Sequence, residues 1–487
     1  MKKHNISIII LCLGIILMLP SCAINPVTGK RQLMTMSEEE EIKLGSDYDP
    51  QVMATFGEYS NEPLLAFIEE KGNEMGLISH RPGLTYHFRV LDSPVINAFA
   101  VPGGYIYLTR GILAQFNNEA ELMGVLGHEM GHITARHTAS QLSKQQFSQL
   151  LLIGGMIVSE EFRKYGQYAM AGMQLLFLSF SRENEREADQ LGVEYASKIG
   201  YDAHKMADFY QVLKKMNLAS DHSGVPTFMS THPDPGDRYN AVLQDATRWQ
   251  GILDFESWKV NKTSYLQLID GLVYGEDPRQ GYVEGNMFYH PNLQFHFPVP
   301  SEWELVNSPV QVSMSPPDGK ALMIFTISQE KTLEDAANVT LQQLELNLLK
   351  SNRTTVNGMQ AISMLSNQTS TDQSTGQQQT IMVLSCFIDH NNTYFVFHGV
   401  SEEADFDYYS RVFEPTMMNF DKLTEPSKLN IQPKKIRIRE VKQTGTLADA
   451  LRALDVPQEQ MEGFAFLNNM ELTDQVAAGS LIKIVGD

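Results

Sequence analysis

The sequence predicts an α+β fold: a mainly helical first domain with a small β-sheet, a separate α+β domain and a small C-terminal α+β module. Three observations support this prediction. Helical periodicity dominates residues 37–255, where only short strand patterns interrupt it. Strand-like runs then prevail over 283–424. A linker at 425–435 containing Pro and Lys separates them from the last segment, 436–487.

The composition is that of a globular protein and excludes several functional classes. Of the 487 residues, 43% are hydrophobic and 20% are charged, which argues against a largely disordered or fibrous chain. No apolar run reaches the roughly 18 residues of a transmembrane helix. The 38 basic and 58 acidic side chains give a formal charge of −20, so the surface suits nucleic-acid phosphates poorly. Three cysteines are too few for a disulfide framework.

The N-terminus has the pattern of an export signal. A basic start and an apolar run over residues 6–19 end at Ser21-Cys22, which resembles a bacterial lipobox. We therefore expect residues 1–21 to be a lipoprotein signal peptide and Cys22 to be lipidated, with a tether over 22–36. The alternative is an ordinary signal peptide in which the cysteine stands by chance.

The elements of the first domain can be predicted in chain order. Ser37 and Glu40 form a capping box that begins a helix. The turn formers at 102–104 divide an apolar run into two short strands. The remaining patterns predict helices at 60–78, 118–140 and 168–199, strands at 84–91 and within 98–108, and a loop at 219–237. The apolar runs 150–158 and 169–180 are interpreted as buried or membrane-surface helices.

The sequence shows no group of catalytic residues in the later segments. For the domain at 283–424 we expect strands at 295–297, 322–325, 381–384 and 394–397, a helix near 332–350 and a polar loop at 366–379. For the module at 436–487 we expect strands at 436–438 and 481–485 around helices at 447–454 and 458–466. Thr446-Leu447, Leu467-Asn468 and Gly479-x-Leu481 loosely match a LysM module, so peptidoglycan binding and a plain capping role both stay open.

One motif carries chemistry. His128-Glu129-Met130-Gly131-His132 lies within a helical pattern that Asn118 caps together with Glu121. Residues i and i+4 share one face of a helix, so His128 and His132 can bind the same metal ion, and two imidazoles at this spacing suit one tetrahedral Zn²⁺. Glu129 is then the expected general base toward a metal-bound water. Gly124, Gly127, Gly131 and Ala135 line the same side of the helix, which allows another element to approach closely.

A catalytic zinc site needs a third protein ligand, and the sequence offers one on a second helix. Glu185 and Asp189 are spaced i, i+4, and small residues continue their stripe. Glu185 is therefore the predicted third ligand, and Asp189 is placed to accept a hydrogen bond from a ligating imidazole. Glu183 and Glu187 lie about 200° around the helix and are predicted to be solvated. His137 falls about 140° from the ligand face of its helix and is interpreted as structural.

These motifs resemble the zinc metallopeptidase family of the CAAX prenyl protease and HtpX, peptidase family M48, and within it the BepA-like periplasmic lipoprotein branch. The resemblance covers about residues 25–250. It rests on His128-Glu129-x-x-His132, Glu185-x-x-x-Asp189, and the segments 97–106, 135–137 and 231–233 with Arg238. It implies a gluzincin-type peptidase domain. Residues 255–487 show no helical repeat of about 34 residues, unlike the tetratricopeptide domain of the periplasmic relatives.

The resemblance also implies roles for two further segments. Asn97 to Val101 would form the sheet edge along which a peptide substrate lies, since an open edge offers unpaired backbone groups. A buried hairpin is the alternative. His232 would lie near the metal, where it either stabilises the oxyanion or occupies the open metal position and keeps the enzyme latent. A loop histidine before a proline is the alternative there.

Together these features predict a zinc metalloendopeptidase of the bacterial cell envelope, lipid-anchored in the outer membrane and facing the periplasm. His128, His132 and Glu185 would hold one zinc ion, Glu129 would act as base, and Asp189 and His232 would assist. By resemblance, the expected substrates are misfolded or stalled envelope proteins. The alternatives are an outer-membrane assembly factor or chaperone in which cleavage is secondary, and a glycan-anchored envelope protein.

Overall fold

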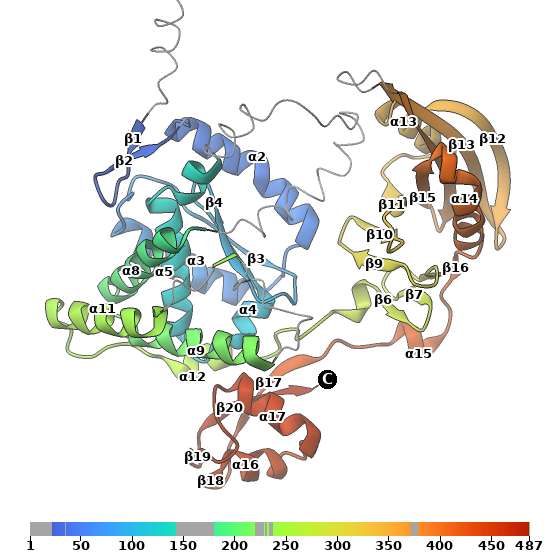
Figure 1. Cartoon of the computed structure of the whole chain (residues 1–487). Coiled ribbons are helices and arrows are strands. Elements are labelled where there is room, and N and C mark those ends of the chain that lie inside the picture. Colours follow the sequence, from blue (N-terminus) through green and yellow to red (C-terminus); the bar gives the residue numbers. More distant parts are fainter. Residues whose placement is uncertain are drawn as a thin grey trace, which may run out of the picture.

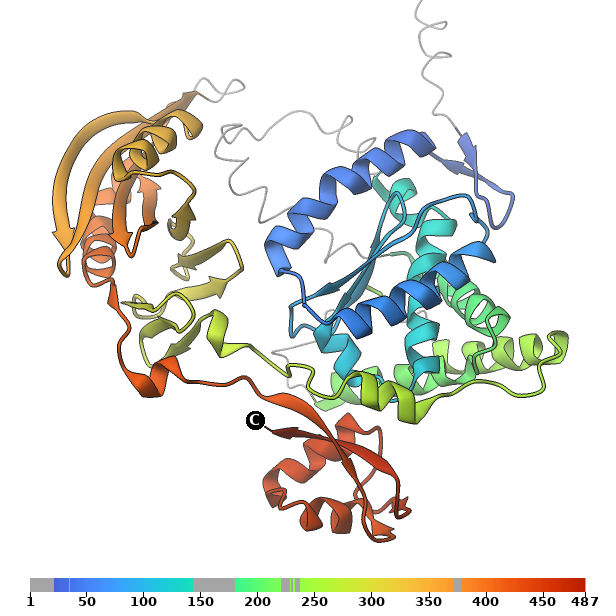
Figure 2. The ribbon, with the colours of Figure 1, turned by 180° about the vertical axis from the view of Figure 1, so that it is seen from behind.

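The computed structural model describes residues 22–34, 36–142, 180–219, 228, 231–232, 237–371 and 378–486. It has the mixed α+β character that the sequence predicts. Figure 1 shows a first part with most of the helices, a second part built on a large curved sheet, and a small C-terminal module beneath the first part. The reverse view in Figure 2 shows the same three parts. No helix among the described residues is long and apolar enough to cross a membrane.

The first part consists of helices around a three-stranded sheet. In the sheet order β3-β5-β4, β5 is parallel to β3 and antiparallel to β4. Its strands and the N-terminal hairpin are β1 (Cys22–Ile24), β2 (Arg31–Leu33), β3 (His87–Leu91), β4 (Ala98–Val101) and β5 (Tyr105–Thr109). Its helices are α2 (Glu38–Phe56), α3 (Glu62–Leu77), α4 (Arg110–Gln115), α5 (Glu119–Thr134), α8 (Arg182–Lys198), α9 (His204–Ala219), α11 (Arg238–Ile252) and α12 (Lys262–Leu268).

Helices α5 and α8 pack closely because glycines meet at their crossing. A Cβ on Gly127 would lie 2.9 Å from the carbonyl oxygen of Gly192. A Cβ on Gly131 would lie 3.2 Å from the Cα of Ala188. The close approach that the small residues predict is therefore confirmed, and it sets the gap into which both helices project their polar side chains.

The second part is a seven-stranded antiparallel sheet in the order β12-β13-β14-β15-β11-β10-β9, with a four-stranded sheet in the order β16-β8-β7-β6 beside it. The strands are β6 (Tyr282–Glu284), β7 (Met287–His290), β8 (Phe295–Pro298), β9 (Glu304–Asn307), β10 (Gln311–Ser315), β11 (Ala321–Ser328), β12 (Asn347–Val356), β13 (Met359–Thr371), β14 (Gln378–His390), β15 (Thr393–Glu402) and β16 (Asp421–Lys422). The helical elements are η1 (Pro278–Gln280), α13 (Leu333–Gln343), α14 (Glu403–Met418) and, in the linker, α15 (Pro426–Leu429).

The predicted polar loop at 366–379 is wrong in most of its length. Strand β13 continues to Thr371 and β14 begins at Gln378, and their register pairs Thr369 with Thr380. The two Thr hydroxyls lie 2.9 Å apart and are exposed. The polar composition therefore reflects a hairpin whose ends project into solvent, because β-branched Thr favours strands even without burial.

The C-terminal module is built as strand, helix, helix, strand, as predicted. Its main strands β17 (Lys435–Glu440) and β20 (Leu481–Gly486) pair antiparallel, and α16 (Leu447–Ala453) and α17 (Gln458–Leu467) connect them. The short strands β18 (Gly445–Thr446) and β19 (Gln475–Val476) form a second pair. The predicted signal peptide at 1–21 and the apolar runs at 150–158 and 169–179 lie outside the described residues.

Candidate metal centre

The first half of the centre comes from α5. The side chain of Asn118 accepts from the backbone N–H of Glu121, so the helix begins where the capping pattern predicts. Two turns further on, His128 and His132 project from one face, and both are fully buried. Their Nε2 atoms lie 3.0 Å apart. The i, i+4 spacing thus brings two ring nitrogens to a single point.

The other half comes from α8 and from residue 232. Glu185, fully buried, lies with Oε2 3.6 Å from His128 Nε2 and with Oε1 3.5 Å from His132 Nε2. His232 is also fully buried, and its Nδ1 lies 3.1 Å from Glu185 Oε1 and 3.2 Å from His128 Nε2. The candidate ligand atoms of all four residues lie within 4.8 Å of one another. The structure therefore brings the predicted ligands together and adds His232 to them.

The donor set fits a zinc ion. Because His128 Nδ1 faces the carboxylate of Asp189 at 2.9 Å, its Nε2 carries a lone pair toward the cluster. Facing nitrogen lone pairs repel unless a cation lies between them. Two ligands about 2.05 Å from a tetrahedral zinc lie about 3.3 Å apart, close to the separations found here. Glu185 Oε2 is buried without a hydrogen-bond partner among the described residues, as expected of an atom that would hold a metal ion.

Asp189 belongs to a buried charged network behind the cluster. Arg238, on α11, donates to both carboxylate oxygens at 2.6 and 2.8 Å, and Tyr210 donates to Oδ1 at 2.6 Å. Although burial alone would raise the pKa of Asp189, the charges of Arg238 and His128 outweigh it and lower that pKa. Asp189 is therefore ionised at neutral pH and fixes the tautomer of His128. Arg238 Nη1 also reaches Glu185 Oε2 at 3.3 Å.

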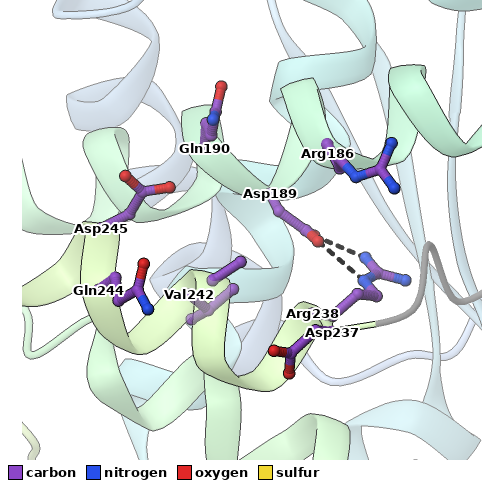
Figure 3. Close-up of a pocket in the computed structure, with 9 residues that line it drawn as sticks. Arg186, Asp189, Gln190, Asp237, Arg238, Val242, Gln244 and Asp245 are labelled. Atoms are coloured by element: carbon purple, nitrogen blue, oxygen red, sulfur yellow. Dashed lines mark hydrogen bonds and ion pairs between the residues drawn. The ribbon is translucent and has the colours of Figure 1, made fainter.

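A pocket of about 480 Å³ opens on the outer side of this network, between α8 and α11. Figure 3 shows the Asp189–Arg238 ion pair at its wall, with Gln190 and Asp245 further along it. None of the four clustered ligands lines it. The pocket therefore lies behind the centre rather than at its reacting face.

The structure corrects the predictions for His137 and Glu187. Helix α5 ends at Thr134, and Arg136 adopts a left-handed backbone with φ 59°, so the helix axis is interrupted before helical structure resumes at His137. His137 Nδ1 then lies 3.1 Å from Nδ1 of His132, and its Nε2 lies 3.1 Å from Glu187 Oε2. Extrapolating the helix placed His137 on the wrong face. Glu187 is partly buried and orients His137, whereas Glu183 is exposed as predicted.

This arrangement can fix the tautomer of His132, the second histidine of the motif. His137 Nε2–H can donate to Glu187, which leaves His137 Nδ1 free to accept from the Nδ1–H of His132. His132 Nε2 then carries its lone pair toward the cluster. Burial also lowers the pKa of His132, which favours the neutral ligand form. Asn25, in the N-terminal hairpin, donates to the other oxygen of Glu187 at 3.3 Å.

Glu129 lies beside the cluster. It is fully buried, and neither carboxylate oxygen has a hydrogen-bond partner among the described residues. Burial raises the pKa of Glu129, although His232 and His128 act in the opposite direction. His232 Nε2 lies 3.5 Å from Glu129 Oε1. A carboxylate with unused lone pairs and a raised pKa is suited to accept a proton.

The predicted substrate edge lies next to the segment that carries His232. Strand β4 is at the edge of its sheet, as expected, and its side chains are buried. Just before it, the carbonyl of Ile96 accepts from the N–H of Phe228 at 3.1 Å. The ring of Phe228 stacks on His232 with centroids 4.5 Å apart. The position of His232 is thus tied to the start of this strand.

Sequence reasoning missed Tyr210, and it assigned no role to Arg238. Tyr210 lies within an ordinary amphipathic pattern, so no local signal marks it. Arg238 directly follows Asp237 at the beginning of α11 and looks like a surface charge in sequence. The packing of α11 on α8 brings Arg238 to Asp189, and Tyr210 reaches the same carboxylate from α9.

Comparison with known proteins gives a consistent answer. Residues 66–246 match the model of peptidase family M48. This segment of the chain is therefore similar to that peptidase family. The matched range includes the entire cluster and both helices that carry its ligands, so the family resemblance seen in the sequence is confirmed.

Curated relatives support the BepA-like branch. The β-barrel assembly-enhancing protease of Escherichia coli K12 is 30% identical over 253 residues, which are 49% of this chain and 51% of that protein. The protein of the same name from Yersinia pestis is 29% identical over 239 residues, 47% of this chain and 49% of that one. The mitochondrial metalloendopeptidase OMA1 of Arabidopsis thaliana is 30% identical over 185 residues, 38% of this chain and 36% of that one. The chain thus spans about half the length of the first two.

Proposed function

We propose that this chain is a zinc-dependent endopeptidase. The observation that carries the proposal is the convergence of His128, His132 and Glu185 from two helices on one point, with the unpartnered carboxylate of Glu129 beside it. The metalloendopeptidase named among the relatives supports the same reaction.

In this proposal the chain supplies ligands, a base and electrostatic support. A bound zinc ion lowers the pKa of its water and polarises the substrate carbonyl. Glu129 takes the proton of the attacking water and returns it to the nitrogen that leaves when the peptide bond breaks. Asp189 and His137 hold the two histidines in the tautomers that present Nε2 to the metal. Arg238 keeps Asp189 ionised.

His232 is proposed to latch the centre in the conformation seen here. Four protein ligands fill a tetrahedral zinc site, which leaves no position for water. His232 would therefore have to withdraw before cleavage, after which it could donate to the developing oxyanion. Two outcomes separate these roles. If the latch dominates, His232→Ala raises the basal rate of cleavage of an unfolded protein; if oxyanion stabilisation dominates, the variant is slower by about 10²–10³-fold in kcat.

The decisive experiment compares zinc content and activity in matched variants of the full chain. Glu185→Ala should lose the metal, because the site loses a ligand. Glu129→Gln should keep the metal but lose cleavage of a fluorescently labelled unfolded polypeptide. Glu183→Ala, on the exposed face of the same helix, is the control and should change neither. Full zinc occupancy in Glu185→Ala, or normal cleavage by Glu129→Gln, would contradict the proposal.

We further propose the arrangement and location that the sequence predicts. A gluzincin-type peptidase domain would cover 37–255, followed by an accessory domain at 283–424 and the module at 436–487. Lipidation of Cys22 would hold the chain at the outer membrane on the periplasmic side, where misfolded or stalled envelope proteins would be its substrates. Mass spectrometry of the membrane-extracted protein tests the anchor, since an unmodified Cys22 contradicts it. Cosedimentation with purified sacculi tests glycan binding by the module.

A further inference from the structure

The C-terminal module is docked on the first part of the chain. Residues 271–274 run beside 434–436, with three backbone hydrogen bonds of 2.8 Å: Gly271 N–H to Ile436 O, Ile436 N–H to Leu272 O, and Tyr274 N–H to Lys434 O. Apolar side chains of the module, among them Ile436 and Ile482, belong to the same continuous core as the apolar residues of α5. Figures 1 and 2 both show the module against the α12 side of the first part.

Lys483 is the charged group at this junction. It comes from β20, and it is fully buried. Its ammonium group donates to the carbonyl oxygens of Ala114, Gln115 and Phe116 at 2.9, 3.2 and 3.0 Å. These are the last carbonyls of α4 and its cap, which a helix leaves without intrahelical partners. A side chain of the module thus caps a helix of the peptidase domain, using all three of its donors.

The capped turn leads directly into the helix that carries the zinc-binding motif. Glu121, in the first turn of α5, accepts from the N–H of Asn117 and from Nδ2 of Asn118, both at 2.7 Å. Glu121 is buried, and its negative charge is the one that acts on Lys483. Burial lowers the pKa of Lys483 and raises that of Glu121, while the attraction between the two opposes both shifts. The turn between α4 and α5 is therefore held by hydrogen bonds to Lys483 on one side and to Glu121 on the other.

We infer that Lys483 is a positioning residue of the peptidase centre. It fixes the turn at 114–118, and that turn fixes where α5 begins. Since α5 is a single helix that begins at Glu119, its N-terminal position determines where His128 and Glu129 lie, about 14–15 Å further along the axis. The distances of His128 and Glu129 from Glu185, which is on α8, therefore depend on where α5 begins. The family match ends at residue 246, so a segment outside the matched domain contributes to the site.

This inference rests on the proposed endopeptidase function, and its test separates the two. The variant is Lys483→Met in the full chain, which keeps the aliphatic stem and removes the three donors. Leu451→Ala, in the core of the module, is the control for a loss of thermal stability, because it changes no residue of the turn or its cap. Lys442→Met, at an exposed lysine of the module, is the control for charge. The readouts are kcat and KM on a labelled unfolded polypeptide, the rate of zinc release to a chelator, and hydrogen exchange of residues 117–122.

Lys483→Met should lower kcat by about tenfold or more, with KM within about twofold, because misplacing catalytic groups by about 1 Å costs up to about 10²-fold. It should also speed zinc release and amide exchange in the first turn of α5, whereas the two comparison variants should leave all three readouts near wild type. Native kcat and exchange in Lys483→Met, or equal losses in Leu451→Ala, would overturn the inference. If the wild-type chain cleaves nothing, the proposed function fails, but zinc release and exchange still decide the role of Lys483.

Discussion

Gly192→Ala should weaken zinc binding without touching any ligand. A Cβ at this position would lie 2.9 Å from the backbone nitrogen of His128, 3.0 Å from the carbonyl oxygen of Gly124 and 3.2 Å from the Cα of His128. All three atoms are backbone atoms of α5, so they cannot rotate away. Ordinary contacts of carbon atoms lie near 3.5–4.0 Å. The two helices must therefore separate by roughly 0.5–1 Å.

The magnitude follows from two opposing effects. Overpacking of this kind costs about 1–3 kcal/mol, and the better helix propensity of Ala returns about 1 kcal/mol. The net cost is therefore up to about 2 kcal/mol. Without metal, the helices can spread and relieve the strain. The bound ion pulls Glu185 and His128 back together, so the cost appears as a zinc affinity weaker by up to about 30-fold.

The assay is competition for zinc with a chromogenic chelator, together with thermal unfolding of the metal-free protein. Gly463→Ala is the matched control, because Gly463 lies inside α17 and an added Cβ there would meet no atom within 4 Å. Its zinc affinity should equal that of wild type, and its stability should rise by about 0.5–1 kcal/mol. Native zinc affinity in Gly192→Ala would show that α5 and α8 do not meet at this glycine, and would refute the reasoning about the gap.

Three further predictions concern two residues next to the candidate metal ligands and one histidine of the sheet domain. Asp189→Asn should retain some zinc, with zinc affinity or activity about 10–100-fold lower, which is the usual effect of removing a hydrogen-bond partner of a metal ligand. Metal titration measures this, and unchanged zinc binding would contradict it. Glu187→Gln should also weaken zinc binding, whereas Glu183→Gln should not; equal behaviour of the two variants would remove the proposed role of His137. Burial lowers the pKa of His398, in the sheet domain, to about 4 from its ordinary 6.5. The unfolded chain then binds the extra proton, so the sheet domain should lose about 3 kcal/mol as the pH falls from 7 to 4, and urea unfolding of His398→Gln should show a smaller loss.

The parts of the centre that could be predicted from sequence are those fixed by helix geometry alone. His128 and His132 share a face because of their spacing, and the capping pattern places the start of their helix within one residue. The choice of Glu185 over Glu187 follows from the small residues along one stripe. These inferences need only the period of a helix and the rule that close packing requires small side chains.

The predicted direction of the His137 side chain was wrong because α5 ends earlier than its periodicity implies. The pattern at 118–140 is helical throughout in composition, yet α5 ends at Thr134, and a turn at residues 135–136, where Arg136 has a positive φ, separates it from the helical residues 137–142. Neither residue is a glycine or a proline, so no strong local signal marks the end. The turn is held by tertiary contacts instead: Arg136 donates to Glu41 at 3.0 Å. A helical projection extended past such a point gives every later residue the wrong direction.

Lys483 shows why long-range docking cannot be found from a strand pattern. In the run 481–485, a single Lys stands among Leu, Ile and Val, and the alternation of a strand would place it on the face opposite Ile482, toward solvent. Both residues are fully buried, since the peptidase domain covers the second face. Burying an ammonium group is costly unless its donors are satisfied, and here three carbonyls of one helix end satisfy them. A lysine in an apolar strand pattern therefore indicates a covered face only when its hydrogen-bond partners are known. The partners of Lys483 lie 367 to 369 residues earlier in the chain, where the strand pattern cannot reveal them.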